Sequence, residues 1–182
     1  KDRFLLKDVS YERIMEELFK ILKSECAFKV LSEMDKTGVL EAVLPQVAVM
    51  FGCEQGPYHH LDVWKHSLET VRQLEEILSR IKDEECRQYL ATPLSANRPR
   101  YALMKLAALL HDIGKPEARR KKNEGREKRF TFYGHEHKGK YIVKQIAKML
   151  KISTEERHKL EDMVLWHLRP GYLSNFKKPS EK

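Results

Sequence analysis

A long apolar run that ends in a histidine–aspartate pair constrains this chain more than any other feature. Residues 101–110 read YALMKLAALL, a composition typical of a buried helix. The string HDIGK follows at once, beginning with His111 and Asp112. An imidazole and a carboxylate at the mouth of a buried helix are ligands suited to a hard-to-borderline metal ion. The sequence therefore predicts a helical domain with a metal site at the end of one core helix.

Helical periodicity and helix-boundary residues extend along nearly the whole chain. Amphipathic or apolar helices are predicted over residues 11–23, 25–36, 39–44, 61–81, 83–90, 101–110, 136–151 and 154–168. Ser24 is predicted to cap the second of these, and Ser153 with Glu156 forms a capping box for the last. A loop is predicted over 92–100, and a polar hairpin or an irregular loop over 121–132. The pattern predicts an all-α fold.

Length and composition indicate one soluble domain, alone or with a small appendage. The 182 residues are 41% hydrophobic and 34% charged, which fits a globular protein with a sizeable core. The longest uncharged stretch, 42–53, is too short for a membrane span, and no secretory signal is visible. Cys26, Cys53 and Cys86 form no CxxC pair, which favours small, buried, reduced thiols and a cytoplasmic location. Because the chain starts at Lys1, we expect it to be part of a longer protein.

The net charge of +8 is unevenly spread. Residues 117–129 read EARRKKNEGREKR, with seven lysines and arginines against three glutamates. A basic segment beside a metal site favours a polyanionic substrate such as RNA, and a solvated surface loop is the alternative. On the first interpretation, phosphate would be contacted by Arg119, Arg120, Arg126 and Arg129.

Three further histidines are placed so that they could share a cation with His111 and Asp112. His66 and His167 fall on the apolar faces of their predicted helices, and His135 opens a helix. A lone histidine on an apolar face is usually a satisfied core residue, but four beside a carboxylate would each carry a desolvation penalty without a shared cation. This donor set suits Mn, Fe, Co, Ni or Zn. The two oxygens of Asp112 could bridge two ions about 3.5–4 Å apart, as two-metal phosphoesterases require.

Lys115 lies close enough to the doublet to contact a substrate phosphate, unless it is an ordinary lysine at a helix C-terminus. Second-rank candidates are His59, His60, Asp62 and Glu136. The two carboxylates among them could each orient the ligand histidine nearest to them, because a metal-bound imidazole usually donates its other N–H to a carboxylate. A solvated surface position is the alternative for all four.

The doublet in its HDIGK context resembles the HD superfamily of metal-dependent phosphohydrolases, and the wider pattern is more specific. The strings SYERIMEELFKIL, YHHLDVWKHSLE, LAALLHDIGKP, TFYGHEHKG and WHLRP resemble, in this order, the part of bacterial tRNA nucleotidyltransferases and poly(A) polymerase-like enzymes that follows the catalytic head. The resemblance implies an all-α HD-domain helical bundle over residues 58–182, preceded by a small helical RNA-binding-like segment over residues 1–49. In some members of the family the HD domain hydrolyses 2′,3′-cyclic phosphates, 2′-nucleotides and other small phosphates.

Two departures from the family pattern matter. No glycine-rich turn with a DxD pair is present, so this stretch is not expected to add nucleotides by itself. The superfamily pattern ends with a distal aspartate ligand, but no aspartate follows His167, and Asp162 falls on another face of the helix. We therefore expect the last ligand to lie beyond Lys182 and the HD domain to be C-terminally incomplete.

The residues and the resemblance together predict a metal-dependent phosphohydrolase: a phosphodiesterase or phosphatase acting on 2′,3′-cyclic or terminal phosphates of a nucleotide or an RNA. His66, His111 and Asp112 would bind a divalent ion (Ni, Mn, Mg, Fe, Co or Zn), and His135 and His167 would contribute to a second position. Asp112 and Lys115 would be the catalytic residues.

The expected partner is tRNA or a nucleotide phosphate, with no membrane involved. Two alternatives stay open. The chain could be a catalytically idle tRNA-binding or dimerisation module, or it could be a free-standing HD nucleotide phosphohydrolase. A homodimer is among the expected assemblies.

Overall fold

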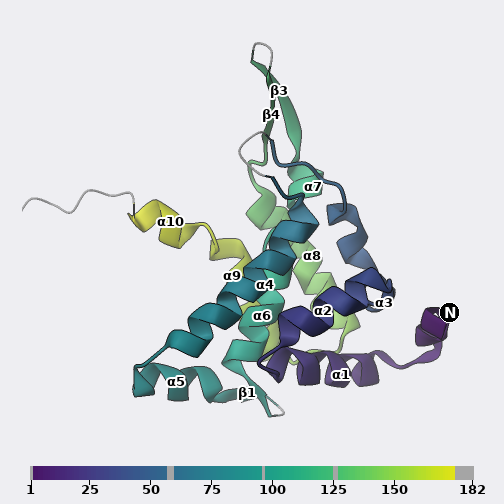
Figure 1. Cartoon of the computed structure of the whole chain (residues 1–182), viewed down its shortest axis with the longest axis vertical. Coiled ribbons are helices and arrows are strands. Elements are labelled where there is room, and N and C mark those ends of the chain that lie inside the picture. The colour runs from purple at the N-terminus through teal and green to yellow at the C-terminus, as the bar shows by residue number, and fades with distance from the viewer. Residues whose placement is uncertain (1, 57–59, 96, 125–126, 175–182) are drawn as a thin grey trace, which may run out of the picture.

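Helices form the body of the molecule, as predicted for an all-α fold (Figure 1). The computed structural model describes all residues except 1, 57–59, 96, 125–126 and 175–182, and it describes only the backbone of residues 2–4, 122–124, 127–129 and 174. The α-helices are α1 (Tyr11–Lys23), α2 (Ala27–Lys36), α3 (Val39–Val43), α4 (Val63–Arg80), α5 (Glu84–Ala91), α6 (Arg100–Leu110), α7 (Lys115–Ala118), α8 (His135–Met149), α9 (Thr154–Trp166) and α10 (Arg169–Ser174). The 3-10 helices are η1 (Asp2–Asp8) and η2 (Pro45–Met50), and the strands are β1 (Pro93–Ser95), β2 (Arg98–Pro99), β3 (Arg120–Glu124) and β4 (Glu127–Thr131).

The apolar run 101–110 forms the central helix, α6. It packs against α4, α9 and α1, while α8 packs against α9 and α7 (Figure 1). Leu103, Leu106 and Leu110 of α6 are at most 1% exposed, which confirms that this helix is buried. A single hydrophobic cluster runs from α1 through α4 and α6 to α9. The N-terminal helices therefore share one core with the rest of the chain.

Side-chain caps fix where several helices begin. α4 starts at Val63, two residues later than predicted, because the Asp62 carboxylate caps it by accepting the Lys65 N–H at 2.8 Å. The capping box predicted for α9 is confirmed: the Ser153 hydroxyl accepts the Glu156 N–H, and the Glu156 carboxylate accepts the Ser153 N–H.

The predicted cap of α2 is wrong, and a buried ion pair takes its place. Ser24 ends α1 instead, donating its hydroxyl hydrogen to the Ile21 carbonyl oxygen. The Glu75 carboxylate of α4 accepts the N–H groups at the start of α2, at 2.7 Å from the Ala27 nitrogen. Lys105 of α6, 3% exposed, donates to the same carboxylate at 2.8 Å. This pair ties α2, α4 and α6 together.

Two hairpins interrupt the helices. The segment predicted as a loop over 92–100 contains the short pair β1–β2, which brings Arg98 to Glu156 of α9, with nitrogen–oxygen distances of 2.6 and 2.7 Å. The segment predicted as a hairpin or a loop is a hairpin, β3–β4, which pairs Arg120 with Thr131 and projects from the bundle (Figure 1). Among the described residues, no helix combines the length and apolarity needed to cross a membrane.

The three cysteines are free thiols, as predicted, but the prediction that they are buried is correct for only one of the three. Cys53 lies in the core, whereas Cys26 and Cys86 are exposed. The prediction of buried thiols is wrong for these two, because each stands at or near the start of a helix on its solvent side.

Candidate metal centre

Helix ends bring four histidines and one aspartate to a single point. His66 lies in the first turn of α4, and His135 is the first residue of α8. His111 and His167 are the C-cap residues that follow α6 and α9. Asp112 follows His111 in the turn that leads to α7. The five residues come from widely separated parts of the sequence and meet because the ends of these helices pack together around α6.

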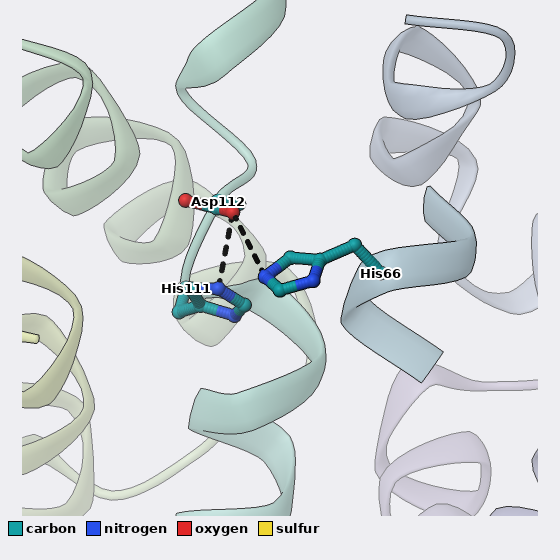
Figure 2. A group of neighbouring side chains, drawn as sticks. All are labelled: His66, His111 and Asp112. Atoms are coloured by element: carbon teal, nitrogen blue, oxygen red, sulfur yellow. Dashed lines mark ion pairs between the residues drawn. The ribbon is translucent and has the colours of Figure 1, made fainter. Parts of the chain in front are cut away.

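The Asp112 carboxylate stands at the middle of the cluster, and each of its oxygens faces a different pair of histidines. Oδ2 lies 3.1 Å from His111 Nε2 and 3.6 Å from His66 Nε2. The dashed lines in Figure 2 mark these two contacts. Oδ1 lies 3.3 Å from His135 Nε2 and 3.6 Å from His167 Nε2. One carboxylate therefore links two groups of donors, and in each group the donor atoms lie within 4.8 Å of one another.

Backbone carbonyls orient three of the rings. The Nδ1 atoms of His111, His135 and His167 lie 2.7 to 2.8 Å from backbone carbonyl oxygens one turn earlier in the chain. A carbonyl oxygen can only accept, so each Nδ1 carries the hydrogen and, in the neutral ring, each Nε2 presents a lone pair to the centre. This is the orientation in which a histidine binds a metal ion through Nε2.

Burial and nearby positive charge keep the aspartate ionised. Burial by itself raises the pKa of a carboxyl group, but the hydrogen bonds that the His111 and His135 rings donate when they are protonated, together with the charges of His111 and Lys115, outweigh it. The pKa of Asp112 consequently stays well below its ordinary value, although the residue is only 1% exposed. Burial, helped by the nearby charge of His111, lowers the pKa of His167, which favours the neutral ring that a metal ion requires.

The residues fit one or two divalent cations. Asp112 Oδ2 is buried and accepts no hydrogen bond of normal geometry from any described residue, and three ring lone pairs point at the same carboxylate. Lys115 places one positive charge beside Oδ2, but lone pairs that face a carboxylate and one another are costly inside a protein unless a further cation lies among them. Imidazole nitrogens with a carboxylate oxygen suit Mn, Fe, Co, Ni and Zn, and a carboxylate can bridge two such ions.

Lys115 belongs to the cluster and is not a lysine at a helix C-terminus. It is the first residue of α7, its ammonium group lies 2.7 Å from Asp112 Oδ2, and it donates to Gln55 Oε1 at 2.6 Å. Gln55 is buried, and sequence reasoning missed it because it precedes Lys115 by 60 residues in a segment without periodicity. The Lys115 ammonium group, which Gln55 holds in place, is therefore a half-buried cation beside the Asp112 carboxylate.

Two glycines near the doublet are needed for different reasons. A Cβ atom on Gly114 would overlap the carbonyl oxygen of His135 and come within 2.5 Å of the Gly139 nitrogen. Gly114 has a φ of −82°, so a glycine is needed there for close packing and not for backbone freedom. Gly134 is the opposite case: its φ of +76° turns the chain into α8 just before His135.

The predicted phosphate-contacting arginines are only partly described. Arg119 stacks on the Phe130 ring at 3.8 Å and pairs with Glu54 at 3.4 Å, and Arg120 is exposed at the base of β3. Arg126 and the side chain of Arg129 lie outside the described residues. None of these contacts brings Arg119 or Arg120 onto Asp112.

The second-rank residues differ in their positions. The Asp62 carboxylate faces the backbone amides of Lys65 and Gly52, so its role as an orienting group is replaced by helix capping. Glu136 Oε2 lies 3.6 Å from His135 Nδ1, beside the carbonyl that orients this ring. His60 is exposed, and His59 lies outside the described residues.

Asp162 cannot replace the distal aspartate of the family pattern. It is exposed and pairs with Lys140 of α8 at 4.0 Å, on a face of α9 away from His167. This agrees with its predicted place on another face of the helix.

A helical bundle that gathers a histidine–aspartate doublet and further histidines at converging helix ends defines a helical domain with a candidate metal site. Residues 63–179 match the HD domain family, and the chain belongs to that family. Residues 1–51 match a second family, described as a probable RNA and SrmB-binding site of polymerase A.

Two curated relatives match nearly the whole chain. The A-adding tRNA nucleotidyltransferase of Deinococcus radiodurans is 30% identical over 160 residues, which are 87% of this chain and 32% of the relative. The CC-adding tRNA nucleotidyltransferase of Thermus thermophilus is 32% identical over 157 residues, which are 86% of this chain and 31% of the relative. The chain spans about a third of the length of these relatives. The predicted resemblance is thereby confirmed: the chain combines an HD domain with a polymerase A-type RNA-binding segment and is similar over most of its length to tRNA nucleotidyltransferases.

Proposed function

We propose that this chain is a metal-dependent phosphohydrolase that acts on 2′,3′-cyclic or terminal phosphates of a nucleotide or an RNA end. One observation carries the proposal. Four imidazole nitrogens from four helix ends lie within 3.1 to 3.6 Å of one buried carboxylate. A buried site with this many acceptors and an ionised aspartate is the arrangement expected of a divalent metal centre.

In this proposal, one ion position is formed by His66, His111 and Asp112, and a second by Asp112, His135 and His167. Each group supplies three protein donors, so coordination positions are left for water and substrate. Ions bound there would supply a nucleophilic water at neutral pH and neutralise charge on the phosphoryl oxygens. Ni, Mn, Mg, Fe, Co and Zn are all candidates.

The chain's own residues have distinct parts in the proposed reaction. Asp112 remains ionised at neutral pH and supplies a negative charge that both positions share. The backbone carbonyls behind His111, His135 and His167 hold each Nε2 toward the centre. Lys115, already fixed beside Asp112 by Gln55, is placed to donate to a phosphate oxygen. Arg119 and Arg120 would contact more distant phosphates.

The test is hydrolysis of 2′,3′-cyclic AMP by the 182-residue chain with added Ni, Mn or Mg. We expect turnover that EDTA abolishes and that His111→Ala and Asp112→Ala each reduce to background. His158→Ala is the matched control, because His158 is an exposed histidine on α9, the helix that His167 caps. Turnover that survives in both ligand variants would sink the assignment.

RNA binding without catalysis is the second candidate, and the match of residues 1–51 to an RNA-binding family favours it. On this reading residues 1–49 bind tRNA and residues 58–182 support them, with dimerisation as a further role. The net charge of +8 supports electrostatic binding to phosphates. Steeply salt-dependent tRNA binding that is unchanged by EDTA, in a chain that retains no metal on elemental analysis, would favour this candidate over hydrolysis. The free-standing nucleotide phosphohydrolase is less well supported, because both curated relatives are tRNA nucleotidyltransferases.

A further inference from the structure

An open cleft of about 560 Å³ lies directly beside the histidine cluster. His135 and Lys115, which belong to the cluster, also line this cleft. Its other walls carry aromatic side chains from the segment before α8 and from the ends of α9 and α10. A volume of this size falls within the range of small-molecule and cofactor sites.

The aromatic side chains of the cleft are unusually exposed. Tyr133 is 89% exposed, Tyr172 is 62% exposed, and Trp166 is 46% exposed even though a guanidinium group covers part of it. Large aromatic groups gathered at one exposed hollow mark a binding site more often than a bare surface. None of these three side chains contributes to the hydrophobic core.

Positively charged side chains lie over two aromatic rings of the cleft. The Arg169 guanidinium carbon lies 4.1 Å from the centroid of the Trp166 ring, and Lys115 Nζ lies 5.6 Å from that of Phe132. One carboxylate, Glu136, is also in the lining, and it faces His135 and His137. Alternating rings and cations are the pattern by which proteins hold single-stranded nucleic acid, since bases stack on the rings while the cations pair with phosphates.

We propose that this aromatic cleft holds the nucleobase of the substrate, a nucleotide or the unpaired end of an RNA strand, while the adjoining phosphate lies at the histidine cluster. The inference rests on the proposed function and adds to it the place where the base of the substrate binds. The cleft and the cluster share His135 and Lys115, so one nucleotide can occupy both. A protein segment is a poorer occupant, because it would bury Lys115 and Arg169 without supplying phosphates to pair with them.

Stacking makes a specific prediction about selectivity. Every base has an aromatic face, so the cleft should discriminate weakly among bases and strongly between a base and none. Loss of one stacking ring should weaken binding about fivefold to a hundredfold.

The experiment measures binding of a 5′-labelled four-nucleotide RNA by fluorescence anisotropy, in EDTA, to the 182-residue chain. The comparison ligand is the same RNA with an abasic 3′-terminal ribose. We expect the abasic RNA to bind at least about fivefold more weakly, and Tyr133→Leu and Trp166→Leu to remove that difference. Tyr141→Leu is the matched control, because Tyr141 is 66% exposed on α8 but does not line the cleft.

Equal binding of the two RNAs, or a base preference that survives in both cleft variants, would overturn the proposal. So would an absence of RNA binding, which would favour a protein segment as the occupant. Hydrolysis of 2′,3′-cyclic AMP is measured in parallel. Base-dependent binding without any turnover would support the cleft and overturn the hydrolase, whereas turnover without base dependence would do the reverse.

Discussion

The Nε2 atoms of His135 and His167 lie 3.2 Å apart, and the Nδ1 atom of each ring faces a backbone carbonyl oxygen. With both Nδ1 atoms protonated, two neutral rings would direct lone pairs at each other and at Asp112 Oδ1. A cation bound between them would remove this repulsion. The relationship therefore links the local geometry of two helix ends to the chemistry proposed for the whole site.

The first prediction concerns stability. A divalent ion that binds the folded chain and not the unfolded one should stabilise it by about 2.7 kcal/mol at a hundred times the dissociation constant. For a chain of this length, that corresponds to a rise of several degrees in the melting temperature, measured by calorimetry with Mn or Ni. His167→Ala should reduce the rise, whereas His158→Ala should leave it unchanged. An equal rise in all three proteins would contradict binding at this site.

The second prediction tests the close approach of the doublet to α8. Gly114→Ala should displace α8 from the His111–Asp112 turn, because its Cβ would overlap the His135 carbonyl oxygen. We expect a loss of about 1–3 kcal/mol in the free energy of unfolding, together with loss of metal binding. Gly171→Ala is the control, since a Cβ built there meets nothing within 4 Å among the described residues beyond its chain neighbours and its own helix backbone. Wild-type metal affinity in Gly114→Ala would show that the spacing is not required.

How much of this structure can be predicted from the sequence depends on how far apart along the chain the interacting residues lie. The buried helix 101–110, the capping box of α9 and the convergence of the histidines on Asp112 follow from local periodicity and from apolar faces that must meet in one core. That these residues bind a metal stays a prediction. The pairing of Glu75 with the start of α2 could not be predicted, because it joins residues 48 positions apart that carry no local signal. The same holds for Gln55 beside Lys115.

The third prediction concerns pH. Burial raises the pKa of Glu156, but its hydrogen bonds with Arg98 and Ser153 outweigh this and hold it below the ordinary value of 4.5. A lowered folded-state pKa means that the pair stabilises the fold above about pH 4.5 and that this stability is lost as the pH falls below it. Glu156→Gln, which can still cap α9, should therefore cost about 3–5 kcal/mol at pH 7. The difference from wild type should shrink between pH 5 and pH 3, measured by urea unfolding.

Glu17→Gln is the control for this titration, since the ion pair between Glu17 and Lys20 is exposed. It should leave the unfolding free energy unchanged at every pH. A Glu156→Gln deficit that stays constant from pH 7 to pH 3 would contradict the assigned role of the buried pair.

The fourth prediction separates Lys115 from the metal ligands. Lys115→Met removes the cation beside Asp112 but no imidazole or carboxylate donor. We expect kcat for 2′,3′-cyclic AMP to fall about 10²–10³-fold, as for loss of one preorganised donor, with metal content retained. Lys138→Met, which alters an ion pair with exposed Glu117, should have little effect on either quantity. Unchanged kcat in Lys115→Met would exclude the lysine from catalysis.

The central claim is that one aspartate and four histidines hold divalent metal, and metal content tests it most directly. The chain and its Asp112→Asn variant are dialysed against Mn or Ni, freed of excess ion and measured by elemental analysis. We predict one or two ions per wild-type chain and none in Asp112→Asn, because both donor groups depend on this carboxylate. No retained metal in the wild type, or equal metal in the two proteins, would contradict the account.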